Sequence, residues 1–394
     1  MNIFNSLGSN YDLNFVIKTL FLDNNQRYKK DLEKYLSEKF NGQTMLTYKG
    51  RQAIELALKI LNLPKDSLVA INGFTCFAVY KAIADAGLKP LYLDIDEGDL
   101  NFSPLELEKA ISKNPNIKVV IIQNTLGFSA KVEKIAEICK KNGIVLIEDL
   151  AHSVGAHYGN GLRAGSLGDF VVLSFSQDKL IDAVSGGALI RKGVKLIHPE
   201  GGIHWHPFSK QVDRFYPLFT FIIRKTYPYF FGKMFHTILK SFNLLSQPMN
   251  DSSSFIGIAP WYCKLAKEQL DNLEGNLNHR KKIAKIYADN ISREVLSSHL
   301  VQEISNSTNL RFPIFINDRL GLTRFLKNKG IFVSDIWYDA PISPKKYMSK
   351  TNYNGECPKA EEISEKILNL PTHKNTSEED ALRISYFINQ WLKQ

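Results

Sequence analysis

Short apolar segments alternate with amphipathic segments through the first half of the chain, and this alternation constrains the fold more than any other feature. The apolar segments occupy residues 68–71, 90–95, 118–123, 144–149, 170–175 and 187–190. The amphipathic segments, with apolar residues at helical intervals, occupy residues 50–62, 75–87, 105–113 and 131–142. Strands that alternate with helices form a buried, mostly parallel sheet, because a helical crossover lets the next strand run in the same direction. The sequence therefore predicts an α/β fold built on one large sheet.

The pattern changes after about residue 200. Residues 203–250 are rich in aromatic and basic side chains, and a long helical stretch begins near residue 261. A strand near residue 310 opens a smaller α+β region that closes with a helix at the C-terminus. We expect a large domain over residues 1–250, with 203–250 as an insert, and a small α+β domain over residues 251–394.

The composition excludes several classes of protein. Of 394 residues, 44% are hydrophobic and 23% are charged, which is typical of a globular chain rather than a disordered or fibrous one. The four cysteines are scattered, with no CxxC pair and no clustered His. We therefore expect no disulfide framework and no metal site, and a cytoplasmic location fits.

The charge pattern points to anionic partners. Fifty basic residues against forty acidic ones give a net charge of +10, which favours phosphates, nucleotides or an anionic membrane. Nucleic-acid binding is not expected, because the basic residues are spread along the chain and form no recognised motif. The N-terminal segment lacks the pattern of a signal peptide, and no uncharged stretch is long enough to span a bilayer.

Three features stand where an open α/β sheet binds its ligands, outside the carboxyl ends of the strands. Asp149 closes one predicted strand, and Ser174 ends another, with Lys179 five residues later. Gly50 and Arg51 begin the first helix of the sheet domain. A lysine, a carboxylate, a hydroxyl and the amides of a helix start are the groups that pyridoxal phosphate (PLP) needs for attachment, ring protonation and phosphate binding.

Each of these residues alone also fits a structural role. A lone lysine is usually a solvated surface charge, and an Asp after a strand is often a helix cap. Ser174 fits a plain turn, and Gly50 fits tight packing. Only the joint arrangement favours a cofactor site.

The chain resembles the DegT/DnrJ/EryC1/StrS sugar aminotransferases, which are PLP enzymes of fold type I, over almost its whole length. The resemblance is densest in IEDLAHSVGAHYGNGLRAGSLGDFVVLSFSQDKLIDAVSGGALI, residues 147–190. This block holds the family's strand-end Asp, the Gln or His three residues later, the Gly-Asp and Ser-Phe pairs, the Lys and the Gly-Gly. Weaker support comes from residues 82–96, 268–273 and 367–373.

The resemblance assigns roles around the cofactor ring. It implies that Lys179 is the catalytic residue and carries PLP as a Schiff base, and that Asp149 pairs with the pyridinium nitrogen. It implies that His152 contacts the ring or its hydroxyl. The family places an aromatic residue over the ring after a Thr, and here either Cys76 or Phe77 would cover that face.

The resemblance also assigns the phosphate site, with one departure. Ser174 would bind the phosphate together with the amides of Gly50 and Arg51. The family usually has a Gly-x-Asn-x-Arg stretch whose Asn reaches the partner subunit's phosphate. The matching region here, SSSFIGIAPWYCKLAKEQL at residues 252–270, has neither the Asn nor the Arg. Which residue makes the contact between subunits is therefore open.

The implied function is transfer of an amino group to a keto-sugar, with a nucleotide-linked sugar as acceptor and glutamate as donor, in amino-sugar or cell-surface polysaccharide biosynthesis. A homodimer is implied, because fold type I enzymes usually build their sites at a two-fold interface. One alternative is a PLP-dependent sugar dehydratase of the same family, but those enzymes carry His where Lys179 stands. The other is a non-catalytic protein that binds a sugar nucleotide in a membrane glycan-assembly complex.

The stretch at residues 203–242 is the second departure from the family. It holds twelve aromatic residues and six Lys or Arg against one Asp. Two apolar helical faces are predicted in it, which suits a helix lying on the inner face of a membrane. The alternative is that these faces pack in a dimer interface or against the sheet.

Overall fold

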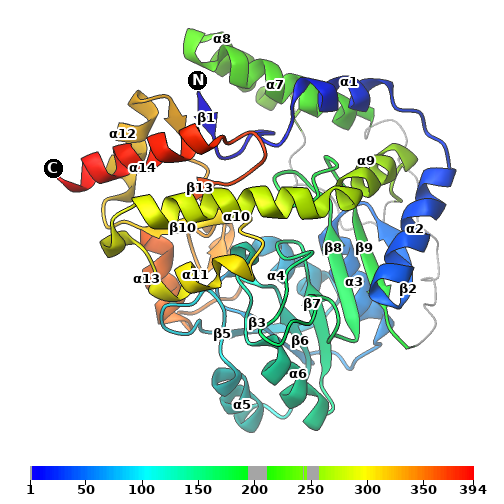
Figure 1. The fold of residues 1–394 in the computed structure, drawn as a ribbon. Coiled ribbons are helices and arrows are strands. Elements are labelled where there is room, and N and C mark those ends of the chain that lie inside the picture. The colour runs from blue at the N-terminus through cyan, green and yellow to red at the C-terminus, as the bar shows by residue number, and fades with distance from the viewer. Residues whose placement is uncertain (1, 194–210, 243, 246–256) are drawn as a thin grey trace.

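The computed structural model describes residues 2–193, 211–242, 244–245 and 257–394 (Figure 1). Part of the aromatic stretch, including Trp205, Phe208 and Lys210, therefore lies outside the described residues. So does most of the SSSFIG segment, which matches the family's stretch for the contact between subunits.

A seven-stranded sheet forms the centre of the large lobe, in the order β2-β9-β8-β7-β6-β3-β5. Its strands are β2 (Gln43–Thr47), β3 (Leu68–Asn72), β5 (Lys89–Leu93), β6 (Ile117–Ile122), β7 (Val145–Asp149), β8 (Phe170–Ser174) and β9 (Gly187–Arg191). Among the described strands of this sheet, β9 alone runs opposite to the common direction, and it pairs antiparallel with β2 and β8. The predicted α/β fold with a large, mostly parallel sheet is confirmed.

The sheet strands are continuous apolar runs because helices cover both faces. Ile121, Ile147 and Val172 are each at most 1% exposed, and burial of such a side chain contributes about 1.5–3 kcal/mol. The helices of this lobe are α1 (Leu13–Phe21), α2 (Arg27–Phe40), α3 (Gly50–Ile60), α4 (Phe77–Asp85), α5 (Pro104–Lys113), α6 (Val132–Lys141), α7 (Tyr216–Thr226), α8 (Phe231–Ser241) and α9 (Pro260–Asp271).

The smaller lobe is built from short strand pairs and helices. Its helices are α11 (Ser298–Gln302), α12 (Arg319–Asn328), α13 (Pro358–Lys366) and α14 (Glu378–Leu392). Its strands are β10 (Arg311–Phe315), β11 (Ile331–Phe332), β12 (Ile342–Ser343) and β13 (Ile367–Pro371). β10 and β13 are antiparallel, and β12 pairs with β4 (Thr75–Cys76) of the large lobe. The Ser377–Asp380 capping box fixes the start of α14.

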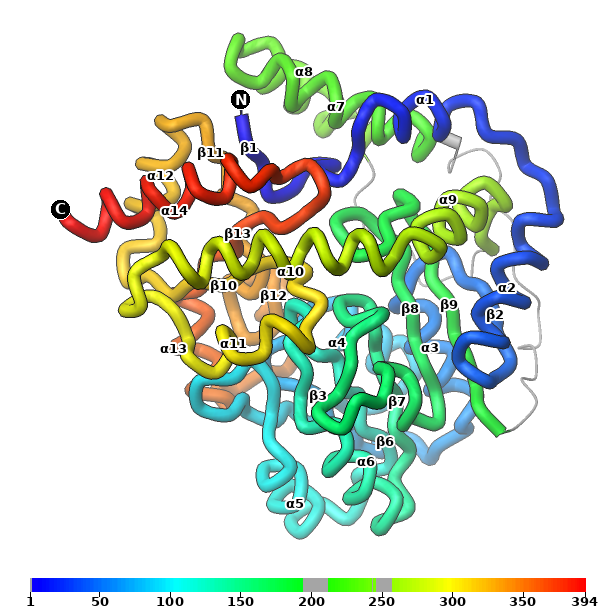
Figure 2. Tube along the Cα trace, viewed as in Figure 1, coloured from blue at the N-terminus to red at the C-terminus, as the bar shows by residue number. Residues whose placement is uncertain are grey.

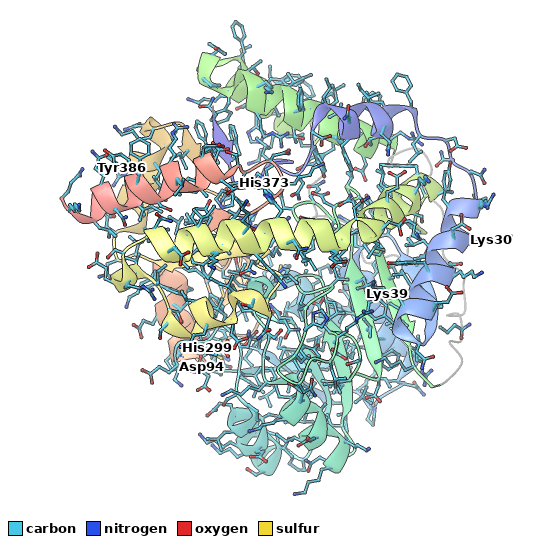
Figure 3. The ribbon with its side chains drawn as sticks, in the orientation of Figure 1. Lys30, Lys39, Asp94, His299, His373 and Tyr386 are labelled. Carbon is cyan, nitrogen blue, oxygen red and sulfur yellow. The ribbon has the colours of Figure 1, made fainter. Side chains whose placement is uncertain are left out.

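The N-terminal strand belongs with the small lobe. β1 (Ile3–Phe4) pairs in parallel with β11, and Ile3 joins the hydrophobic cluster of the small lobe. His373, labelled in Figure 3, donates its Nε2 proton to the carbonyl of Phe4 at 2.8 Å. Burial lowers the pKa of His373 to about 3, so the ring is neutral and the hydrogen bond fixes its tautomer.

Helix α10 (Leu273–Asn290) connects the two lobes, as Figure 2 shows. Leu273 and Leu277 pack in the large core cluster, whereas Ile283 and Tyr287 pack in the small one. Helix α9, directly before it, buries Trp261 with the large sheet. The boundary at residue 250 remains a prediction.

Candidate active site

One pocket gathers the residues that follow the sheet strands. It is lined by Gly50, Arg51, Ile54, Cys76, Ala78, Val79, Gln123, Asp149, Ala151, His152, Ser174, Lys179 and Tyr338. β6, β7 and β8 end at this edge, and α3 begins there. Seven of the eight site residues named from the sequence therefore lie together.

Phe77 is the exception. It begins α4, and its ring stacks on Tyr347 at 4.7 Å and on Tyr80 at 5.6 Å rather than lining the pocket. Cys76, the last residue of β4, lines the pocket in its place. The turn from strand into helix directs these adjacent side chains to different sides, so the structure favours Cys76 of the two alternatives.

Lys179 lies on the loop between β8 and β9, and a buried carboxylate holds that loop. Asp182 accepts the backbone N–H of Asp178 at 2.8 Å and that of Val184 at 3.1 Å. It also accepts the Tyr11 hydroxyl at 2.6 Å, which ties the loop to the N-terminal segment. The position of Lys179 is therefore fixed on both sides along the chain.

The Lys179 amine contacts the imidazole of His152, with 2.7 Å between Nζ and Nε2. The other ring nitrogen, Nδ1, accepts the backbone N–H of Leu126 at 3.2 Å. We therefore assign the imidazole proton to Nε2, which makes Nζ the acceptor. Burial lowers the pKa of Lys179, and burial together with the Lys179 charge lowers that of His152. Burial and this hydrogen bond both favour the neutral amine, which is the nucleophilic form of Lys179.

Asp149 ends β7 and is buried in the same pocket. Its Oδ1 accepts the backbone N–H of Ala151 at 3.0 Å. Burial raises the pKa of Asp149 to about 6, against the opposing effects of that N–H and of Lys179. A carboxylate in this position favours a positively charged partner, because such a partner would offset the cost of burying its charge.

The start of α3 forms a cradle for an anion. A Cβ on Gly50 would lie 2.8 Å from the Cβ of Ser174 and 3.1 Å from its Oγ, so only glycine leaves space beside this hydroxyl. The first amides of a helix have no intrahelical acceptor and lie at the positive end of the helix dipole. Gly50 and Ser174 therefore provide a site of the kind that binds phosphate.

Three residues at or beside the pocket were missed from the sequence. Tyr338 lies 3.1 Å from Gln123 Nε2 and 3.4 Å from His152 Nδ1, measured from its hydroxyl. The Trp337 ring stacks on His152, and the Lys179 amine lies 4.6 Å from the Trp337 ring centroid. Gln123 follows β6, so the strand-end rule that found Asp149 would also have found it. Trp337 and Tyr338 come from the small lobe and carry no local signal.

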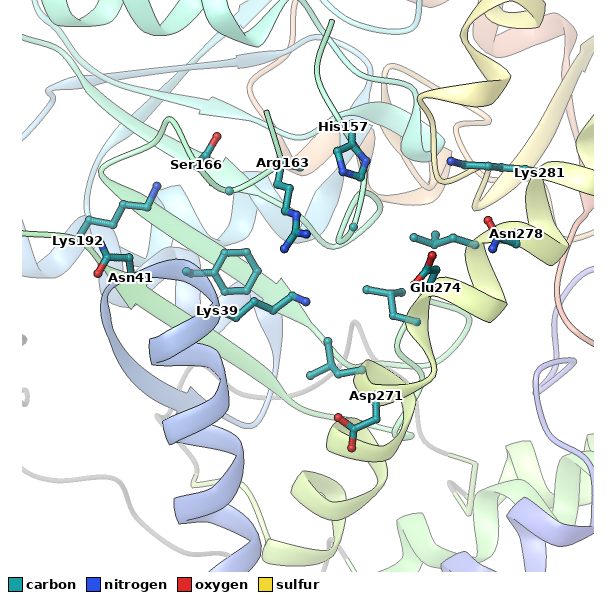
Figure 4. Close-up of a pocket in the computed structure, with 17 residues that line it drawn as sticks. Lys39, Asn41, His157, Arg163, Ser166, Lys192, Asp271, Glu274, Asn278 and Lys281 are labelled. Atoms are coloured by element: carbon teal, nitrogen blue, oxygen red, sulfur yellow. The ribbon is translucent and has the colours of Figure 1, made fainter. Parts of the chain in front are cut away.

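A larger cavity, of about 760 Å³, lies elsewhere and shares no lining residue with this pocket (Figure 4). It is bordered by the end of α2 and by the junction of α9 and α10, and Arg163 and Lys281 point toward it. It lacks the neutral lysine beside a buried strand-end carboxylate. We therefore place the chemistry in the smaller pocket.

Solved structures share this fold. An aminotransferase of the DegT DnrJ EryC1 StrS type from Brucella abortus superposes with a TM-score of 0.71 at 21% identity, over 97% of this chain and 96% of the other. The aminotransferase PseC of Helicobacter pylori, involved in pseudoaminic acid biosynthesis, superposes with a TM-score of 0.73 at 17% identity over all of both chains. The chain therefore has the fold of the fold type I aminotransferases.

The sequence comparisons name the family. The model of the DegT/DnrJ/EryC1/StrS aminotransferase family matches residues 12–217 and 258–388, and the chain belongs to this family of PLP-dependent sugar aminotransferases. A pleiotropic regulatory protein of Geobacillus stearothermophilus is 27% identical over 84% of this chain and 80% of its own. The GDP-perosamine synthase of Escherichia coli O157:H7 is 23% identical over 96% of this chain and 94% of its own.

Proposed function

We propose that this enzyme transfers the amino group of glutamate to a keto-sugar linked to a nucleotide, as a step of amino-sugar or cell-surface polysaccharide biosynthesis. The observation that carries the proposal is the 2.7 Å contact between Lys179 Nζ and His152 Nε2, in a pocket that Asp149 also lines. Relatives named as nucleotide-sugar enzymes support the acceptor class. They include the GDP-perosamine synthase and a UDP-N-acetyl-3-dehydro-α-D-glucosamine 3-aminotransferase of Acidithiobacillus ferrooxidans.

The residues present fit PLP. Lys179 would link the cofactor, Asp149 would face its ring nitrogen, and the start of α3 with Ser174 would hold its phosphate. The space that a Cβ on Gly50 would fill supports the phosphate position. When bound, PLP supplies an electron sink for the negative charge that develops at the donor's Cα.

The chain's own groups would do the proton chemistry. Lys179 Nζ, as a neutral amine, would take the proton from the donor's Cα, and in the second half-reaction it would deliver a proton to the sugar carbon that receives the amino group. His152 would hold that amine in place through Nε2. Asp149, ionised, would keep a proton on the ring nitrogen, and the burial of Asp149 and His152 would limit the access of water. A lysine at position 179 disfavours the dehydratase alternative, which has His there.

The acceptor class is tested with a panel of substrates. The purified enzyme, loaded with PLP and glutamate, is offered UDP-, GDP- and dTDP-linked keto-sugars and the matching free keto-sugars. We expect a single nucleotide-linked sugar to gain an amino group, as measured by mass spectrometry, and the free sugars to react far more slowly. Equal rates with free and linked sugars would contradict the nucleotide requirement. Failure of glutamate to form 2-oxoglutarate while another amino acid reacts would contradict the donor.

We also propose that the enzyme works in the cytoplasm. Its four cysteines, Cys76, Cys139, Cys263 and Cys357, are all free thiols, and three of them are buried. Such thiols suit a reducing compartment.

A further inference from the structure

Helix α8 presents an apolar face to solvent. Phe231 is 66% exposed, Ile238 44% and Phe242 72%, and Met234 lies between them on the same face. Large apolar side chains grouped on one helix face are unusual on a free surface and mark an interaction site. Figure 1 shows α8 with α7 and α1 along one edge of the molecule.

The adjacent face of α8 packs against the rest of the molecule. Phe235 contacts Phe219 of α7 edge-to-face at 5.9 Å, and Leu239 is buried. At Gly232, a Cβ would lie 2.5 Å from the carbonyl oxygen of Ile223, so the two helices approach closely. The exposed face is therefore the outer side of a well-seated helix.

Helix α7 anchors this pair to the body. It buries Tyr216 and Ile223, and the Arg224 guanidinium donates to the carbonyls of Leu7 at 3.2 Å and Tyr11 at 2.8 Å. Because α7 is held to the body in this way, a partner bound by α8 is attached to the whole enzyme.

The family fold does not require α8. The family model matches the chain up to residue 217 and again from residue 258, so α8 lies in the unmatched segment. The pocket described above contains no residue of this segment. The apolar face is thus an addition to the enzyme.

The charged side chains of α7 and α8 are all positive. From residue 214 to residue 245 the chain has no Asp or Glu. Lys225, Lys233 and Lys240 are exposed, and in the described part of the chain none of them has a carboxylate partner. Lys225 lies over the ring of Phe221, and Lys233 over that of Tyr227. An apolar face with lysines at its rim matches the interface of an anionic membrane, where the rings enter the acyl boundary and the amines contact the headgroups.

We infer that α8 binds the surface of an anionic lipid bilayer, with Phe231, Ile238 and Phe242 inserted at the headgroup boundary. None of the described helices is long and apolar enough to cross a bilayer, so the helix would lie in the interface. A second copy of the chain fits less well. A two-fold contact through this face would bring lysines against lysines without any acid to balance them.

Helix α1 extends the surface. Leu13, Ile17 and Phe21 stand four residues apart on one face and are all exposed. α1 packs beside α7, so the two exposed faces belong to one edge of the molecule (Figure 2).

The test measures sedimentation of the PLP-loaded protein with vesicles. Vesicles of equimolar phosphatidylglycerol and phosphatidylcholine are compared with vesicles of phosphatidylcholine alone. We expect the protein to sediment with the anionic vesicles and to bind them more weakly at high salt. We expect little binding to vesicles of phosphatidylcholine alone. Absence of sedimentation with the anionic vesicles at low salt would overturn it.

Three variants separate the contributions. Phe231→Ser with Ile238→Ser and Phe242→Ser should weaken vesicle binding by roughly a hundredfold or more, because the buried apolar area is lost. Lys225→Gln with Lys233→Gln and Lys240→Gln should weaken binding to anionic vesicles by on the order of a hundredfold. The matched charge control changes three exposed lysines of α5 and α6, at the far end of the molecule in Figure 1: Lys113→Gln, Lys140→Gln and Lys141→Gln. This control should bind like the wild type.

The alternative, a contact between two copies of the chain through this face, predicts a different result for the serine variant. The serine variant should keep the wild-type melting temperature and sedimentation coefficient, because the replaced side chains are exposed. If it instead turns a dimer into a monomer, the face is a contact between copies and the membrane inference is wrong. Transamination of a soluble substrate does not require α8 and should be unchanged, so this inference and the proposed function can fail independently.

Discussion

At the scale of single residues, the chemistry of the pocket depends on which side chains are uncharged. The Leu126 amide occupies one nitrogen of His152, and this leaves the other to donate to the Lys179 amine. The pair is therefore most stable with both side chains uncharged. A buried ammonium beside a buried imidazole would be a poor nucleophile and a poor base.

In Asp149→Asn we expect stability to rise and turnover to fall. In the cofactor-free protein, burial raises the pKa of Asp149 from 3.8 to about 6, so the ionised carboxylate destabilises the fold. This cost is absent below pH 4, grows as the pH rises through 6, and reaches about 3 kcal/mol above pH 7. The variant should thus be more stable than the wild type at pH 8 in urea unfolding, yet its turnover should fall roughly a hundredfold or more, because the amide cannot hold the ring proton.

Asp289→Asn, an exposed carboxylate on α10, is the matched control for the loss of one charge. It should change neither turnover nor the pH dependence of unfolding. Near-normal turnover in Asp149→Asn would show that the cofactor ring is oriented differently in the pocket.

Site residues could be predicted from the sequence where they stand at the end of a predicted strand. Asp149 and Ser174 could be named because parallel strands end at one edge of the sheet. The choice between Cys76 and Phe77 could not be made, because it depends on the turn from β4 into α4. Tyr338 could not be found, because it reaches the pocket from the other lobe in a left-handed backbone conformation, with φ of +66°.

At the scale of elements, the start of α3 leaves no room for a side chain beside Ser174. Gly50→Ala adds a methyl group 2.8 Å from the Cβ of Ser174. We expect the fold to remain and the affinity for PLP to fall at least tenfold, measured by fluorescence titration, because the methyl group fills the space for the phosphate.

Gly275→Ala is the matched control on α10, where a Cβ meets nothing within 4 Å. That change should leave PLP affinity intact and stabilise the helix by up to about 1 kcal/mol. Wild-type affinity in Gly50→Ala would remove the α3 start from the phosphate site.

The central strands and their helices could be predicted, because strands buried on both faces read as continuous apolar runs. β2 could not, because this edge strand begins with the exposed Gln43 and the half-exposed Thr44. β1 has two residues and depends on β11, more than three hundred residues away. In the aromatic stretch, sequence periodicity predicted the apolar faces but could not tell the packed Phe235 from the exposed Phe242.

At the scale of the whole molecule, the N-terminal segment packs into the small lobe, which is built mainly from the C-terminal part of the chain. β1 completes the small lobe, and the Phe4 carbonyl accepts the proton of His373. The lobe boundary is therefore crossed by the N-terminal segment as well as by α10.

We predict that the functional unit is a homodimer, since enzymes of this fold type usually build their sites at a two-fold interface. Sedimentation velocity of the PLP-loaded protein should give one dimeric species across the working range of concentrations. A fully active monomer would contradict this and would mean that one chain completes the site.

The central claim, that Lys179 links PLP, is tested most directly by an absorption spectrum. The protein is incubated with PLP, freed of unbound cofactor and scanned before and after addition of glutamate. The wild type and Lys140→Ala, an exposed-lysine control on α6, should show a visible band that glutamate bleaches. Lys179→Ala should show no such band and no transamination, because no other group in the pocket can form the link. A wild-type band that glutamate still bleaches in Lys179→Ala would contradict the account.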